Sequence, residues 1–143
     1  MNTIDIGEAF RRIVEQGIGA GDESVLDELM AETVIENQRG NHPNREGAKE
    51  VSRTLHRWFS DFSLTIQDIA VSGDTVWTRS LARGVNTGNV MGFHATNEPV
   101  EVTVFDVGRF ENGLMVEHWG CADQLGLLMQ TGLDPRSMQT HVH

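Results

Sequence analysis

The sequence contains a single cysteine, no tyrosine and three prolines in 143 residues. With only Cys121 present, no disulfide can form within the chain and no cysteine cluster can hold a metal ion, which fits a reducing cytoplasm. No apolar run approaches the roughly 20 residues that a bilayer requires. Residues 1–6 carry no basic segment ahead of an apolar stretch, so we expect no transmembrane helix, signal peptide or lipid anchor. We therefore predict a cytoplasmic protein.

Basic side chains are also scarce, because 11 lysines and arginines stand against 21 aspartates and glutamates, for a net charge of −10. Such a chain repels a phosphate backbone and an anionic membrane surface, so we expect neither nucleic acid nor a membrane as a partner. A length of 143 residues, 38% of them hydrophobic, suits one domain with a core and an internal pocket. A small molecule is the partner that this composition leaves open.

The first half of the chain has helical periodicity. Apolar residues at helical spacing predict one helix from a cap at Asn2 or Thr3 to about Gln16. A short helix capped by Asp22 follows, and a third helix is predicted over residues 45–59.

The second half has the β-branched and aromatic composition of strands. Hairpin signals lie at residues 73–74 and, more strongly, at residues 111–113. Helices followed by consecutive strands indicate an α+β fold, in which a strongly curved, mostly antiparallel sheet forms a cone-shaped barrel around three N-terminal helices. The interior of such a cone is the expected ligand site. The predicted strands span residues 33–36, 63–71, 75–83, 100–110 and 114–121, and a short helix or turn follows at 123–129.

No nucleophile elbow, phosphate-binding loop, dinucleotide fingerprint or zinc-protease motif occurs, so the chemistry depends on isolated titratable side chains. The sharpest candidate is Asp123, which strand alternation places on the same face as Trp119. A carboxylate beside Trp119 at the edge of an apolar cavity would have a raised pKa and would remove a proton α to a carbonyl. The alternative role of Asp123, which does not exclude the first, is to cap the helix that follows it.

Three further side chains have two interpretations each. His118 titrates in the range of a catalytic base, but strand alternation predicts that it points outward or into a subunit interface. Asp106 lies among apolar residues of a strand, and an ion pair with Arg79 or Arg83 is favoured over catalysis. His94 is expected to be a solvated loop residue or, as the second interpretation, a group at the rim of the pocket.

The third helix and the strands carry a set of short motifs. The strongest is DVGRFENG at residues 106–113, followed by EHW at 117–119 and DQLGLL at 123–128. This set resembles the polyketide cyclases typified by SnoaL, over nearly the whole chain up to about Gly132. The other matching segments are REGAK at 45–49, FSDF at 59–62, Gly73-Asp74, Arg79, RGVNTG at 83–88, Met91-Gly92 and VEV at 100–102.

The resemblance implies the cone-shaped fold that these cyclases share with nuclear transport factor 2, ketosteroid isomerase and scytalone dehydratase. It also implies an intramolecular aldol condensation without a metal or an organic cofactor, with Asp123 as general acid and base. The polyketide's own carbonyls delocalise the enolate, so the protein has only to place one carboxylate and exclude water. The cyclases use a second catalytic histidine on the preceding strand, where this chain has Gly108.

These observations predict one domain over residues 1–135 and a tail over residues 136–143. The expected function is cofactor-independent aldol cyclisation or isomerisation of a small apolar carbonyl compound by Asp123. The alternatives are a non-catalytic small-ligand binding protein of the same fold, or a relative that activates water for hydrolysis or hydroxylation. A homodimer or homotetramer is expected. The expected substrate-binding residues are Asn37, Phe59, Met91, His94 and Trp119.

Overall fold

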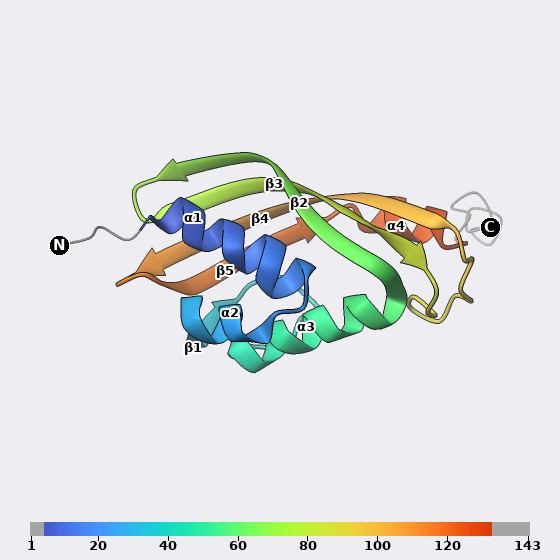
Figure 1. Ribbon diagram of the computed structural model, residues 1–143, viewed down its shortest axis with the longest axis horizontal. Helices are drawn as coiled ribbons and strands as arrows, with labels where there is room; N and C mark the ends of the chain where they lie inside the picture. The colour runs from blue at the N-terminus through green and yellow to red at the C-terminus, as the bar shows by residue number, and fades with distance from the viewer. Residues whose placement is uncertain (1–4, 133–143) are drawn as a thin grey trace, which may run out of the picture.

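The structure, a computed structural model, describes residues 5–132. Figure 1 shows a long curved sheet with its main helices on one side. The first helix is capped by Asp5 rather than by Asn2 or Thr3, because the Asp5 side chain accepts a hydrogen bond from the backbone N–H of Glu8. The tail predicted over residues 136–143 lies outside the described residues. The helices are α1 (Ile6–Arg11), the π-helix η1 (Arg12–Gly19), α2 (Glu23–Leu29), α3 (Asn44–Trp58) and α4 (Gln124–Gln130).

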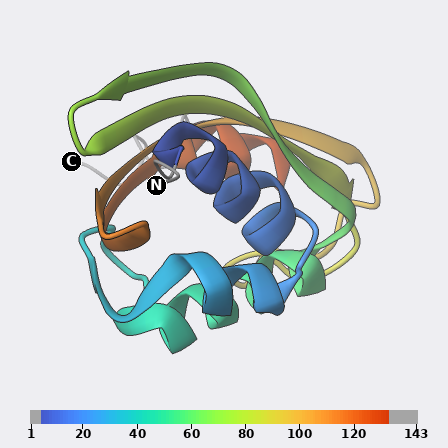
Figure 2. The ribbon, with the colours of Figure 1, turned by 60° about the vertical axis from the view of Figure 1, so that its left-hand side comes forward.

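Five strands form one open sheet in the order β1-β5-β4-β3-β2. Strand β1 runs parallel to β5, and the other neighbouring pairs are antiparallel. This sheet, curved around the N-terminal helices, confirms the predicted α+β class and the cone-like curvature (Figure 2). The third helix ends one residue earlier than predicted, since Phe59 already has extended backbone angles. The strands are β1 (Met30–Glu36), β2 (Phe59–Ser72), β3 (Thr75–Asn86), β4 (Pro99–Glu111) and β5 (Leu114–Ala122).

The first helical segment is longer than the sequence predicts. It continues from α1 without a break and runs as η1 to Gly19, inside the curve of the sheet (Figure 2). A Cβ atom on Gly17 would lie 2.5 Å from a methyl carbon of Leu26, so glycine at this position lets α2 fold back against η1. Glu15 accepts a hydrogen bond from the backbone N–H of Ile66 at 2.9 Å, beside a register shift in β2. The η1 segment therefore also supplies a hydrogen-bond acceptor to a backbone N–H group of the sheet.

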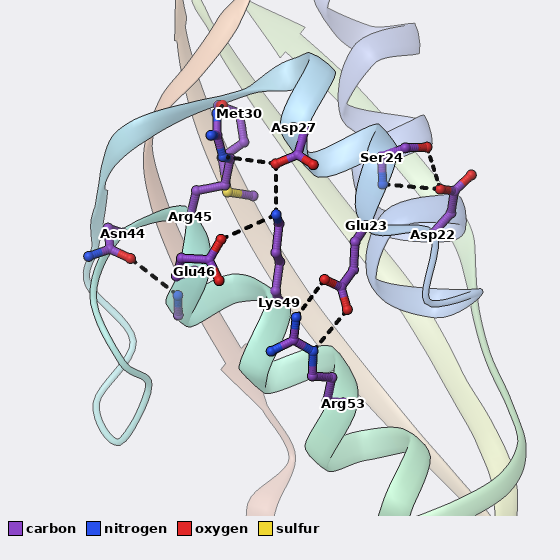
Figure 3. A network of polar contacts seen from close by, with 11 residues as sticks. Asp22, Glu23, Ser24, Asp27, Met30, Asn44, Arg45, Glu46, Lys49 and Arg53 are labelled. Atoms are coloured by element: carbon purple, nitrogen blue, oxygen red, sulfur yellow. Dashed lines mark hydrogen bonds and ion pairs between the residues drawn. The ribbon is translucent and has the colours of Figure 1, made fainter.

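Ion pairs hold α2 against α3 (Figure 3). The Nζ atom of the buried Lys49 lies 2.7 Å from Asp27 and 3.2 Å from Glu46. The hydrogen bond to Asp27 raises the pKa of Lys49, so the ammonium stays charged at this contact. One turn further along α3, Arg53 donates two hydrogen bonds to Glu23, at 2.9 and 2.6 Å. These contacts use the polar faces of the two helices and leave their apolar faces directed at the interior.

The core has two clusters of buried apolar side chains. One surrounds Phe10, Leu26 and Met115 beneath α1 and η1, and the other surrounds Phe59 and Leu127 at the end of the sheet that α4 covers. Both clusters contribute side chains to the same internal cavity. Within residues 5–132, no helix combines the length and the apolar character needed to cross a membrane.

Candidate active site

A cavity of about 350 Å³ lies inside the curve of the sheet. Its walls are mostly apolar, with side chains from η1, α3 and all five strands. Exposed residues such as Arg39, Arg83 and Gln124 mark its rim, whereas Glu36, Asp106 and His118 line it with less than a fifth of each side chain exposed. The cavity therefore combines an apolar wall with one buried polar cluster. The apolar lining includes Ile13, Val34, Val51, Leu55, Phe59, Phe62, Val102, Val104 and Leu127.

The buried polar cluster is centred on His118 in β5. Its Nδ1 atom lies 2.8 Å from Oε2 of Glu36, and its Nε2 atom lies 2.8 Å from Oδ1 of Asp106. Strand pairing explains both contacts. The parallel pair β1–β5 places Glu36 opposite His118, and the antiparallel pair β4–β5 places Asp106 opposite Gly120, two residues further along β5 on the same face.

The two carboxylates keep His118 protonated. Burial alone would lower the pKa of His118, but the hydrogen bonds to Asp106 and Glu36 outweigh burial and raise the pKa to about 9. At neutral pH the imidazolium therefore donates one N–H to each carboxylate. One cation between two anions leaves one net negative charge beside the apolar wall.

The two carboxylates differ in how many of their acceptor sites are used. Both oxygens of Glu36 lie within 3.0 Å of His118 Nδ1, and Oε1 also accepts the backbone N–H of Gln38 at 2.8 Å. Asp106 receives His118 on Oδ1, and within residues 5–132 no hydrogen bond occupies its Oδ2. Asp106 therefore keeps one open acceptor in the wall of the cavity, as a general base requires.

Two of the predicted substrate-binding residues line the cavity, namely Phe59 and Met91. The other three, Asn37, His94 and Trp119, are exposed and do not contribute to its lining. The Asn37 amide instead donates hydrogen bonds to Glu117 and to the backbone oxygen of His118, each at 3.1 Å. Trp119 is 39% exposed.

The outward position predicted for His118 is wrong. Side chains do alternate along β5, but the face with His118 and Ala122 lines the cavity, whereas Trp119 and Cys121 are exposed. The ion pair predicted between Asp106 and Arg79 or Arg83 is also wrong.

The two arginines have other partners, because Arg79 pairs with Asp68 and Arg83 with Glu101 on the exposed surface. Asp106 lies on the inner face of the sheet, where its ion-pair partner is His118.

Asp123 caps α4. Its Oδ1 accepts the backbone N–H of Gly126 at 2.9 Å, as the alternative interpretation of the sequence predicts. The residue is exposed and does not line the cavity, although its neighbours Ala122 and Gln124 do. The catalytic role of Asp123 stays a prediction. Among the titratable side chains that do line the cavity, those of the His118 cluster are the most buried.

Glu36 and Gln38 were missed by sequence reasoning. Both line the cavity, at the end of β1 and just after it. The available signal was a carboxylate at the end of a strand before a turn-rich segment, but its partner lies 82 residues away in the sequence. In the part of the chain that is described, no group of three His, Cys, Asp or Glu side chains is arranged to hold a metal ion.

Several solved structures are similar to this chain. IdmH from Streptomyces antibioticus, a candidate polyketide cyclase, is 32% identical, with a TM-score of 0.78 over 88% of this chain and 97% of that one. TsrD from Streptomyces laurentii is 28% identical, with a TM-score of 0.76 over 87% and 90% of the two chains. AclR from Streptomyces galilaeus, a candidate hydroxylase, is 20% identical, with a TM-score of 0.79 over 93% and 100%, and shows a shared fold alone.

No functionally curated protein matches the chain. The family model of the SnoaL-like polyketide cyclases matches residues 8–131, which is most of the sequence and contains every element of the cavity wall and the His118 cluster. The chain therefore belongs to the SnoaL-like polyketide cyclase family.

Proposed function

We propose that the protein is a cofactor-independent enzyme that carries out aldol cyclisation or isomerisation of a small, neutral, apolar carbonyl compound. The observation that carries this proposal is the 2.8 Å contact between His118 and Asp106 in the wall of a mostly apolar cavity. A carboxylate with one free oxygen, held beside an imidazolium and away from bulk water, is suited to remove a proton from carbon.

In the proposed reaction, Asp106 takes a proton from the carbon next to the carbonyl, and the electron pair of the C–H bond forms an enolate. The enolate carbon then attacks a second carbonyl of the same molecule, which forms the new C–C bond and an alkoxide. Asp106 returns its proton to that alkoxide, so the protein ends the cycle unchanged. For an isomerisation, the same proton returns to another carbon of the enolate.

His118 and Glu36 have supporting roles in this scheme. The imidazolium N–H donated to Asp106 holds that carboxylate in one orientation, and Glu36 holds the imidazolium from its other side. Because Glu36 already accepts bonds from His118 and from the backbone of Gln38, it is less available to a ligand than Asp106 is. In this scheme Asp106 is therefore the base, and His118 and Glu36 are positioning residues.

The test is proton exchange into an apolar ketone. We expect the wild-type protein in D2O to replace the C2 protons of 1-tetralone by deuterium faster than buffer does, as followed by proton NMR. Exchange at the buffer rate would overturn the proposed chemistry. If the ketone is nevertheless bound in that experiment, the protein is better described as a non-catalytic small-ligand binding protein, the alternative that the sequence leaves open.

A further inference from the structure

One more polar side chain converges on the His118 cluster. Gln38 follows β1 and lines the cavity, and its backbone N–H donates to Glu36 while its backbone oxygen accepts from Asn41. Both backbone polar groups of Gln38 therefore have hydrogen-bond partners. No hydrogen bond joins its carboxamide to any other group among residues 5–132, so the amide remains available to a ligand.

Gly120 makes room for this amide. A Cβ atom on Gly120 would lie only 2.2 Å from Oε1 of Gln38, and 3.0 Å from both Oδ1 of Asp106 and Cε1 of His118. The side chains of Gln38, Asp106 and His118 are therefore all close to the Cα atom of Gly120. Asp106 is there because the β4–β5 pairing places it opposite Gly120. Any side chain at this position would displace one of the three, and Gln38 has the shortest contact.

The chemistry of the three groups selects a ligand. A carboxamide that rotates about its last torsion presents either its NH2 or its oxygen, so Gln38 can donate a hydrogen bond to a carbonyl oxygen. The cluster already carries one net negative charge, which repels a carboxylate ligand. A hydrocarbon of the same shape would gain the apolar contacts but would not use the amide.

We propose that Gln38 is a specificity-determining residue, which donates a hydrogen bond to the neutral carbonyl oxygen of a ligand held beside Asp106, and that Gly120 is required to admit its amide. This inference rests on the proposed function, in that it places a carbonyl compound in the same cavity. Because the inference concerns binding preference, its test measures the affinity of ligands and needs no turnover.

The experiment compares three probes by calorimetry or fluorescence: 2-acetylnaphthalene, 2-ethylnaphthalene and 2-naphthoate. We expect wild type to bind the ketone about three- to tenfold more tightly than the hydrocarbon, the change that one neutral hydrogen bond contributes. The carboxylate should bind most weakly. In Gln38→Leu the ketone and the hydrocarbon should bind equally, with the hydrocarbon's affinity unchanged.

Two further variants sharpen the test. Gly120→Ala should abolish the ketone preference as Gln38→Leu does, and combining the two should add no further loss, because both act through the same amide. Gln67→Leu changes an exposed glutamine of β2 that does not line the cavity, and it should keep the wild-type ratio.

A wild-type ketone preference that survives in Gln38→Leu would overturn the assignment, as would a wild type with no preference or with tight binding of 2-naphthoate. These outcomes are separate from those of the exchange experiment. A protein that prefers the ketone through Gln38 but exchanges no proton would retain this inference and lose the proposed function.

Discussion

Nδ1 of His118 lies 2.8 Å from Oε2 of Glu36, and this contact joins the first and the last strand along the chain, which form the parallel pair β1–β5. Each of the two side chains is at most 16% exposed. A buried charge is tolerated when it is paired. Here the two paired side chains line the cavity and also lie on neighbouring strands of the sheet. The stability of the fold and the charge of the site are therefore linked.

Stability should fall with rising pH because of His118. Its pKa is about 9 in the folded protein and 6.5 when unperturbed, so the folded state binds more protons between these values. The stabilisation is complete below pH 6.5 and is lost as the pH rises through 9, by up to about 3 kcal/mol. Urea denaturation at a series of pH values measures it.

An NMR titration of the His118 ring is the companion measurement, and a pKa near 6.5 would contradict the assignment. His94→Gln serves as the control, because this exposed histidine has no part in the cluster and its loss should leave the pH dependence intact. In His118→Gln the decline between pH 6.5 and 9 should disappear.

Gly108 should tolerate no side chain. A Cβ atom there would lie 2.5 Å from a ring carbon of Phe10 and 2.9 Å from the sulfur of Met115, and both residues are fully buried. We expect Gly108→Ala to destabilise the protein by about 1–3 kcal/mol, the usual cost of overpacking. Thermal or chemical denaturation measures this loss. Adding Phe10→Leu should cost less in the Gly108→Ala background than in wild type, and strictly additive effects would show that the two positions do not interact.

The outer face of the sheet carries exposed aromatic side chains, and we propose that a second copy of the chain covers it. Trp77, Val107 and Trp119 are paired across β3, β4 and β5, with Phe105 in the next row. Trp77 and Phe105 are each 54% exposed, and exposed clusters of large apolar side chains commonly mark interfaces.

Light scattering should therefore give wild type at least twice the mass of one chain. Phe105→Glu should shift the mass toward that of a single chain, because it replaces an exposed aromatic ring of the patch by a charge. Val71 is similarly exposed, but it pairs with the buried Val76 and so belongs to the opposite face. Val71→Glu should leave the mass unchanged, and a monomeric wild type would refute the interface.

Much of the fold is predictable from local signals. The turns at Gly73 and Gly113 have positive backbone φ angles and join the predicted hairpins. Asp22 caps its helix as predicted, and its side chain accepts a hydrogen bond from Ser24. Such features depend on neighbouring residues only, and a sequence displays them directly.

The site depends on distant pairings, which a single sequence does not display. Trp119 is the larger and more apolar candidate for the inner face of β5, yet the inner face carries His118. His118 takes the inner face instead of Trp119 because Glu36, from the first strand, and Asp106 supply two charged partners for it there. Without knowledge of the parallel β1–β5 pairing, a buried histidine between two carboxylates could not be anticipated.

In the proposed reaction Asp106, and not Asp123, moves the proton. The most direct measurement is the rate of deuterium exchange into 1-tetralone by Asp106→Asn and Asp123→Asn. Asparagine keeps the shape of aspartate at both positions, accepts the bond from His118 and caps α4 as well as aspartate does, so both variants should fold. We expect Asp106→Asn to lose about a hundredfold or more in rate and Asp123→Asn to stay within about twofold of wild type. Loss of exchange in Asp123→Asn with full exchange in Asp106→Asn would show that Asp123 is the base and Asp106 is not.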